Sequence, residues 1–141
     1  MKYILVVLLA APVADRVGFP EGYREKFRLL RTSNNPEKQE TKVIYGNPAA
    51  AAAFTSSPRN FPYGSILVME SRKQGLLTGL HVMRKERGFG EAYGASRTGE
   101  WEYTEYKPDR SYITTPQKSD ACATCHLKAG PAKDFVYGVA P

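Results

Sequence analysis

Both cysteines of this 141-residue chain lie in one pentapeptide near its C-terminal end, Cys122-Ala123-Thr124-Cys125-His126. Two thiols three residues apart lie about one helical turn apart. They can add to the two vinyl groups on neighbouring edges of one porphyrin, and the next residue can point an imidazole at the iron. The pattern is the attachment signature of a c-type haem. We predict one covalently bound haem c, held by Cys122 and Cys125, with His126 as an axial ligand of the iron.

Other uses of a Cys-x-x-Cys pair stay open at this point. The pair can form a small disulfide, act as a thioredoxin-type redox pair, or supply half of a zinc site. A zinc site takes four ligands, whereas His81 is the only other histidine and there is no second cysteine pair. A thioredoxin motif lies next to a βαβ pattern, whereas this pair follows a run of strand-like segments. Haem attachment is therefore the favoured interpretation.

The start of the chain has the pattern of a secretory signal peptide. A short basic start is followed by an apolar run that ends in small residues, and a polar Asp15 comes next. The run is too short to span a bilayer as a helix. Cleavage after Ala14 would leave Pro12 where a small residue is preferred, so an uncleaved anchor or an ordinary first helix is the alternative. Because haem is joined to this motif outside the bacterial inner membrane, we predict a periplasmic protein with a signal peptide over residues 1–14 and one haem domain over residues 15–141.

Composition limits the class of partner. The chain has a net charge of +6 and a pI near 9.4. The basic residues are dispersed among acidic ones and no aromatic-plus-basic recognition motif occurs, so we expect no nucleic-acid partner. A solvated basic surface is the simplest explanation of the charge. The sharper hypothesis is steering toward an acidic redox partner protein.

Hydrophobic spacing predicts helices near both ends of the chain. After Pro20, apolar residues recur at helical spacing through about Arg31, and a polar loop follows over residues 32–41. The haem motif lies on a last helix that Ser119 or Asp120 can cap. A final apolar patch over residues 134–137 is expected to pack on that helix.

Strand-like segments fill the middle of the chain. The predicted strands cover residues 42–45, 65–70, 80–85 and 101–106; a short helix over residues 48–54, capped by Asn47, and a glycine-rich loop over residues 88–99 lie between them. Strands joined in sequence, with helices at both ends, predict an α+β fold: an antiparallel β-sheet with an N-terminal helix and a C-terminal haem-binding helix.

Several motifs in this order resemble the cytochrome P460 family, which includes the β-sheet cytochromes c′. They are PEGYRE at residues 20–25, VIYGNP at 43–48, FPYGSILVME at 61–70, VMRKE at 82–86, GEWEY at 99–103, CATCH at 122–126 and DFVY at 134–137. The resemblance covers nearly all of the chain after the signal. It implies an antiparallel sheet, haem held by the C-terminal helix and, in many members, a homodimer, which exposed strand edges would permit.

The resemblance implies one of two activities, because the family contains two kinds of member. Cytochromes P460 oxidise hydroxylamine and carry a lysine bonded to the porphyrin, whereas the β-sheet cytochromes c′ lack that bond and bind nitric oxide at a crowded, five-coordinate haem. By alignment the lysine position falls at Met69, whose thioether has no amine to form the bond. Lys73 lies four residues further on and is a poor substitute.

Three residues are candidates for the distal pocket. Met69 shares a strand face with Leu67 and is either a sixth iron ligand or core packing. His81, aligned with a distal acidic group of hydroxylamine-oxidising members, is a proton relay, an iron ligand or a structural histidine. Phe61, and less so Phe54, would form an apolar distal wall that admits a small neutral gas; the alternative is plain core packing.

Three functions follow. The favoured one is a cytochrome that binds nitric oxide or another small gaseous or nitrogenous ligand. The second is an electron-transfer cytochrome with Met69 or His81 as sixth ligand. The third is a hydroxylamine-oxidising oxidoreductase.

Overall fold

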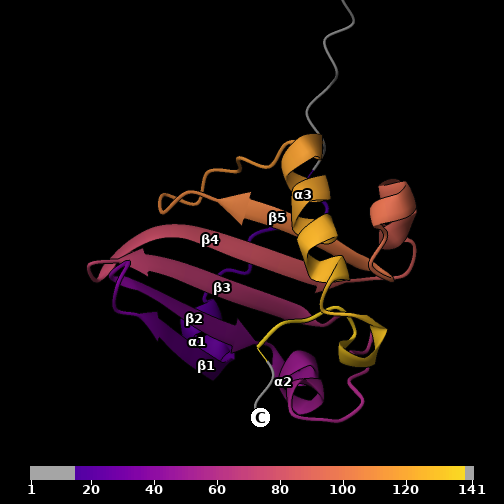
Figure 1. Ribbon diagram of the computed structural model, residues 1–141, viewed down its shortest axis with the longest axis horizontal. Coiled ribbons are helices and arrows are strands. Elements are labelled where there is room, and N and C mark those ends of the chain that lie inside the picture. The colour runs from indigo at the N-terminus through magenta and orange to yellow at the C-terminus, as the bar shows by residue number, and fades with distance from the viewer. Residues whose placement is uncertain (1–14, 139–141) are drawn as a thin grey trace, which may run out of the picture.

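The computed structural model describes residues 15–138, so the predicted signal peptide over residues 1–14 lies outside the described residues. Five strands form one antiparallel sheet in the order β1-β2-β3-β4-β5 (Figure 1). The strands are β1 (Arg28–Asn35), β2 (Glu40–Gly46), β3 (Ile66–Lys73), β4 (Leu76–Lys85) and β5 (Trp101–Tyr106). The helices are α1 (Tyr23–Lys26), α2 (Pro48–Phe54), the 3₁₀ helix η1 (Phe89–Ser96), α3 (Pro116–Leu127) and the 3₁₀ helix η2 (Pro131–Lys133). The α+β prediction is confirmed.

The two faces of the sheet bury separate apolar clusters, because successive side chains of a strand point to opposite faces. On one face, residues of α2, η1 and α3 pack on Leu67, Met83 and Tyr103. On the other face, the segment before α1 and Tyr23 of α1 pack on Val68, Leu80, Val82 and Tyr106. Helices α1 and α3 therefore lie on opposite sides of the sheet (Figure 1).

The short helix α2 and the predicted strands are confirmed; β2, β3 and β4 are longer than the sequence indicated, and β5 has the predicted bounds. Asn47 caps α2, since its side-chain oxygen accepts from Ala50 N at 3.1 Å. The same oxygen accepts from Ile66 N at 3.1 Å, and Asn47 Nδ2 donates to Gly64 O at 2.7 Å. This one side chain therefore ties α2 to the start of β3.

The prediction of one helix through Arg31 is wrong. Helix α1 ends at Lys26, Phe27 is extended, and β1 begins at Arg28. The register of β1 on β2 shifts between Leu29 and Arg31. The apolar residues Phe27, Leu29 and Leu30 imitate helical spacing in the sequence, but pairing with β2 overrides that local signal. The predicted loop over residues 32–41 is wrong for the same reason: residues 32–35 belong to β1, residues 40–41 to β2, and only residues 36–39 form a turn.

Two smaller predictions are also corrected. Thr115, rather than Ser119 or Asp120, caps α3: its hydroxyl accepts from Lys118 N at 3.2 Å, and Pro116 occupies the first turn, where proline is favoured. The glycine-rich segment forms η1, which is broken at Gly94 (φ 50°, ψ −124°). Within residues 15–138, no helix has the length and apolar character needed to cross a membrane.

Candidate haem site

Helix α3 and one face of the sheet enclose a cavity of about 600 Å³, a size typical of sites for small organic ligands and cofactors. All three residues of the haem motif, Cys122, Cys125 and His126, line it from α3. The facing sheet supplies a largely apolar wall, and the segment after α3 closes one side. Lining residues from the sheet, from α2 and from this segment include Ile44, Phe54, Leu67, Met69, His81, Met83, Tyr103, Val136 and Tyr137.

His126 is held in one tautomer by the backbone. Its Nδ1 lies 2.7 Å from Phe135 O, and because a carbonyl oxygen only accepts, Nδ1 carries the proton. The other nitrogen, Nε2, then keeps the lone pair that a metal needs, which is the arrangement usual for metal-ligating histidines. The ring packs beside Tyr103 and Tyr137, with centroid distances of 4.8 and 5.4 Å. Burial lowers the pKa of His126, which favours the neutral ring, although the bond to Phe135 acts in the opposite direction.

The two cysteines are free thiols on neighbouring turns of α3. Cys122 is half-buried and Cys125 is exposed, and both line the cavity. Burial raises the pKa of the Cys122 thiol, and the charge of Glu105 acts in the same direction. Tyr137 donates its hydroxyl to Cys125 O at 2.7 Å, so the segment after α3 also holds the turn that carries Cys125.

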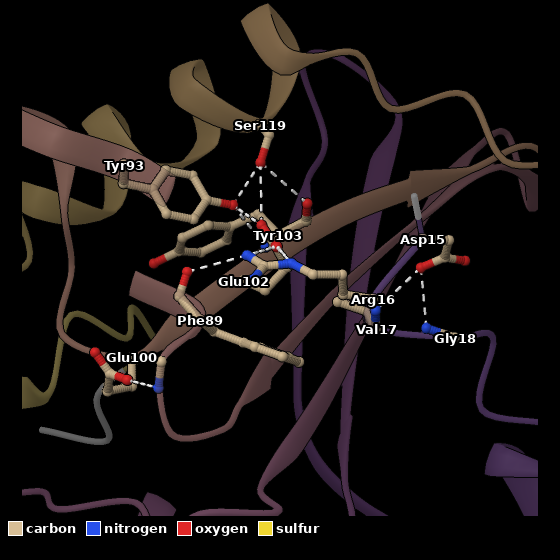
Figure 2. A network of polar contacts seen from close by, with 11 residues as sticks. Asp15, Arg16, Val17, Gly18, Phe89, Tyr93, Glu100, Glu102, Tyr103 and Ser119 are labelled. Carbon is tan, nitrogen blue, oxygen red and sulfur yellow. Dashed lines mark hydrogen bonds and ion pairs between the residues drawn. The ribbon is translucent and has the colours of Figure 1, made fainter. Parts of the chain in front are cut away.

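The first half of α3 is anchored by a buried polar network, which Figure 2 shows. The Tyr93 hydroxyl donates to Glu102 Oε1 and lies within hydrogen-bond distance of Ser119 Oγ. Arg16 Nε donates to Glu102 Oε2 at 2.6 Å. Ser119, expected as a cap, is instead one of the buried contacts between α3 and the sheet. The network therefore joins the N-terminal segment, η1, β5 and α3 around the helix that carries the haem motif.

Met69 and His81 are direct partners across β3 and β4, so they lie side by side on the cavity face, next to Ile44 of β2. Within residues 15–138 the His81 ring makes no hydrogen bond. Burial lowers the pKa of His81; Lys42 and Lys118 act in the same direction, and Glu105 opposes them. Two potential iron ligands thus face the cavity from the sheet.

The structure places Phe61 away from the cavity. Its ring is 1 % exposed and packs edge-on against Trp101, with a centroid distance of 5.4 Å. Phe54, the last residue of α2, lines the cavity in its place. The reason is topological: Phe61 lies in the connection before β3, whereas α2 packs on β1, β2 and β3 beside the cavity.

Several lining residues were missed from the sequence. Arg31 and Lys42 bring positive charge to the cavity from β1 and β2, and Tyr103 brings an aromatic ring from β5. The alternation of Lys42 with Ile44 indicates a shared strand face, but the cavity face was not identifiable before the sheet register was known. The contact of the Phe135 carbonyl with His126 could not be predicted, because every residue has a backbone carbonyl and no residue type marks this one.

The residues present fit a haem group. Cys122 and Cys125 would hold it, His126 would offer Nε2 to the iron, and the apolar sheet face would shield the porphyrin from water. The tautomer fixed by Phe135 O is the observation that supports this fit.

A search of curated proteins returned no match. The model of one family, described as Cytochrome P460, matches residues 20–138, which include the sheet, α3 and the segment that closes the cavity. On this match the chain belongs to the cytochrome P460 family and is a haem-binding cytochrome.

Proposed function

We propose that this cytochrome is an exported c-type protein with one haem, attached through Cys122 and Cys125 and ligated by His126, that binds nitric oxide on the sheet side. The observation that carries the proposal is the apolar cavity wall opposite α3, with the thioether of Met69 where the related hydroxylamine oxidisers have a lysine. The apolar side chains of Ile44, Leu67 and Met69 on this wall disfavour water but admit a small neutral gas, although Arg31 and Lys42 also line the cavity.

When bound, haem supplies a redox-active iron with a coordination position for a small ligand. The residues of the chain hold and orient the haem. Cys122 and Cys125 hold the group by two points one helical turn apart. His126 offers a neutral imidazole whose orientation Phe135 O fixes. Leu67, Ile44 and their neighbours exclude water from the opposite side.

Absorption spectra of the ferric and ferrous protein, with and without nitric oxide, test the proposal. We expect a high-spin ferric spectrum and rapid binding of nitric oxide to the ferrous protein. Intact mass after digestion should show haem joined only at Cys122 and Cys125. A low-spin spectrum with two strong axial ligands would overturn the nitric-oxide function, and a third attachment point would favour hydroxylamine oxidation.

Electron transfer is the second candidate, because Met69 and His81 face the cavity as a cross-strand pair. It requires one of them as a sixth ligand. Under the first proposal, Met69→Leu and His81→Gln leave the high-spin spectrum unchanged. If either substitution converts a low-spin spectrum into a high-spin one, that residue is the ligand and electron transfer is the better function.

Export is proposed from the first 14 residues together with the haem motif. The Asp15 side chain accepts from Val17 N at 3.1 Å and from Gly18 N at 2.9 Å, and Tyr106 donates to it. A cut after Ala14 would therefore leave a mature start that is anchored to β5. N-terminal sequencing of the periplasmic fraction should begin at Asp15; recovery only from the cytoplasm would contradict export.

A further inference from the structure

The segment that follows α3 presents three consecutive carbonyls to three side chains from elsewhere in the fold. Trp101 Nε1 donates to Asp134 O at 2.9 Å, His126 Nδ1 to Phe135 O at 2.7 Å, and Arg59 to Val136 O at 3.1 Å. The carbonyl that orients the candidate iron ligand thus lies between two buried anchors.

The backbone at this point is in a conformation that side chains disfavour. Asp134 has φ 48° and Phe135 has φ 61°, both in the left-handed region. Residues held in such sparsely populated regions persist when the surrounding structure fixes them, and they cluster at functional sites. What holds this turn therefore also sets where the Phe135 carbonyl points.

A buried ion pair holds it. Asp134 Oδ2 accepts from Lys85 Nζ at 2.7 Å and from Phe61 N at 2.9 Å, and Lys85 Nζ also donates to Phe61 O at 2.8 Å. Both charged side chains are almost entirely buried, with exposures of 12 % and 11 %. Lys85 is the last residue of β4, so the pair fastens the turn to the end of the sheet.

We propose that Lys85 and Asp134 are positioning residues that set the hydrogen bond between the Phe135 carbonyl and His126 and thereby tune the reduction potential of the iron. The inference rests on the proposed ligation of iron by His126. A carbonyl that accepts the Nδ1 proton makes the imidazole a stronger donor to the metal. Stronger donation favours the ferric state, so a well-held carbonyl keeps the potential low.

The direction of the change in reduction potential distinguishes this positioning role from a direct electrostatic effect of the two charges on the iron. By charge alone, removing the Lys85 cation would lower the potential and removing the Asp134 anion would raise it. If the pair acts through the carbonyl, both removals loosen the same hydrogen bond, and both raise the potential. The Fe–His stretching frequency of the ferrous protein should fall in both variants for the same reason.

The experiment compares haem-loaded wild type with Lys85→Met, Asp134→Asn and Lys85→Arg by redox titration and resonance Raman spectroscopy. We expect a positive shift in potential and a lower Fe–His frequency for the first two, and near wild-type values for Lys85→Arg, which keeps a charged donor. Lys73→Met is the matched control: it removes an exposed lysine at the end of β3, and both readouts should stay unchanged.

A negative or absent shift for Lys85→Met overturns the proposal, even if Asp134→Asn does not accumulate as folded holoprotein. A wild-type spectrum without histidine ligation overturns the proposed haem ligation together with this inference. Wild-type histidine ligation combined with unchanged variants overturns the positioning role alone.

Discussion

The two histidines of the chain share one cavity but differ in what fixes them. His126 donates Nδ1–H to a backbone carbonyl and packs beside two tyrosines, so its orientation is set. His81 has no hydrogen-bond partner within residues 15–138 and faces the cavity next to Met69. The first environment suits a permanent metal ligand, and the second suits a side chain that meets a ligand only when one is present.

His81 should contribute to the loss of stability in mild acid. Burial lowers its pKa, so below the ordinary histidine value of about 6.5 the unfolded chain binds a proton that the folded chain does not. Stability therefore falls as the pH falls through that window. His81→Gln removes this contribution and should flatten the slope by at most about 1.4 kcal/mol per pH unit. Denaturant unfolding of the holoprotein from pH 8 to pH 5 measures it.

The comparison has an internal control at pH 8, where neither form of residue 81 is charged and the pH slopes of the two proteins should coincide. Equal slopes below pH 6.5 as well would show that His81 does not carry the effect.

At the level of elements, α3 is fixed at both ends by different means. Its first half rests on the buried network of Tyr93, Glu102 and Ser119, and the turn that carries Cys125 receives a hydrogen bond from Tyr137. Only Ser119 and Ala123 of α3 are buried, so the helix has few apolar side chains to pack against the sheet. Polar anchors therefore position the haem motif against the sheet.

Tyr93→Phe tests the anchor. It keeps the ring but removes the donor to Glu102, and leaving a buried acceptor without its partner costs about 1–3 kcal/mol. The free energy of unfolding should fall by that amount. Tyr63→Phe is the matched control, because Tyr63 is 50 % exposed and its ring contact with Arg87 is kept. Equal stabilities of the two variants would contradict an anchoring role.

In the whole molecule, the sheet separates the cavity from a second, structural cluster. On the face opposite the cavity, Glu70 is buried and accepts hydrogen bonds from Tyr23, Arg24 and Arg72. Burial opposes ionisation, but these three donors outweigh it and hold the pKa of Glu70 below its usual range. The stabilisation is therefore present above the ordinary glutamate pKa and is lost as the pH falls through the lowered one.

Glu70→Gln should lower the free energy of unfolding at pH 7 by about 1–3 kcal/mol, because it weakens several buried hydrogen bonds at once. The haem spectrum should not change, since Glu70 lies across the sheet from the cavity. Urea unfolding and absorption spectra measure both. Glu21→Gln, in an exposed pair with Arg110, is the control and should cost less than about 1 kcal/mol. A changed haem spectrum in Glu70→Gln would contradict the division between the two faces.

The sequence alone determined what is local. The haem motif is recognised from the spacing of a few residues on one helix. Asn47 and Pro48 predict the start of α2, and the alternation of aromatic and polar residues predicts β5. Each of these signals needs only neighbours within a turn or a strand, so no knowledge of the rest of the fold is required. The α+β class followed from their order.

Tertiary structure decided everything that depends on register and on contacts between distant segments. Strand β1 replaces the helix that was predicted after Lys26, and the sheet register brings Arg31 and Lys42 to the cavity. Phe54, rather than Phe61, lines the cavity. Tertiary structure also placed the Phe135 carbonyl against His126 Nδ1 and brought Lys85 to Asp134, 49 residues further along the chain. Such contacts leave no local pattern, because backbone carbonyls look alike in sequence and which strand face meets α3 is fixed only when the sheet has formed.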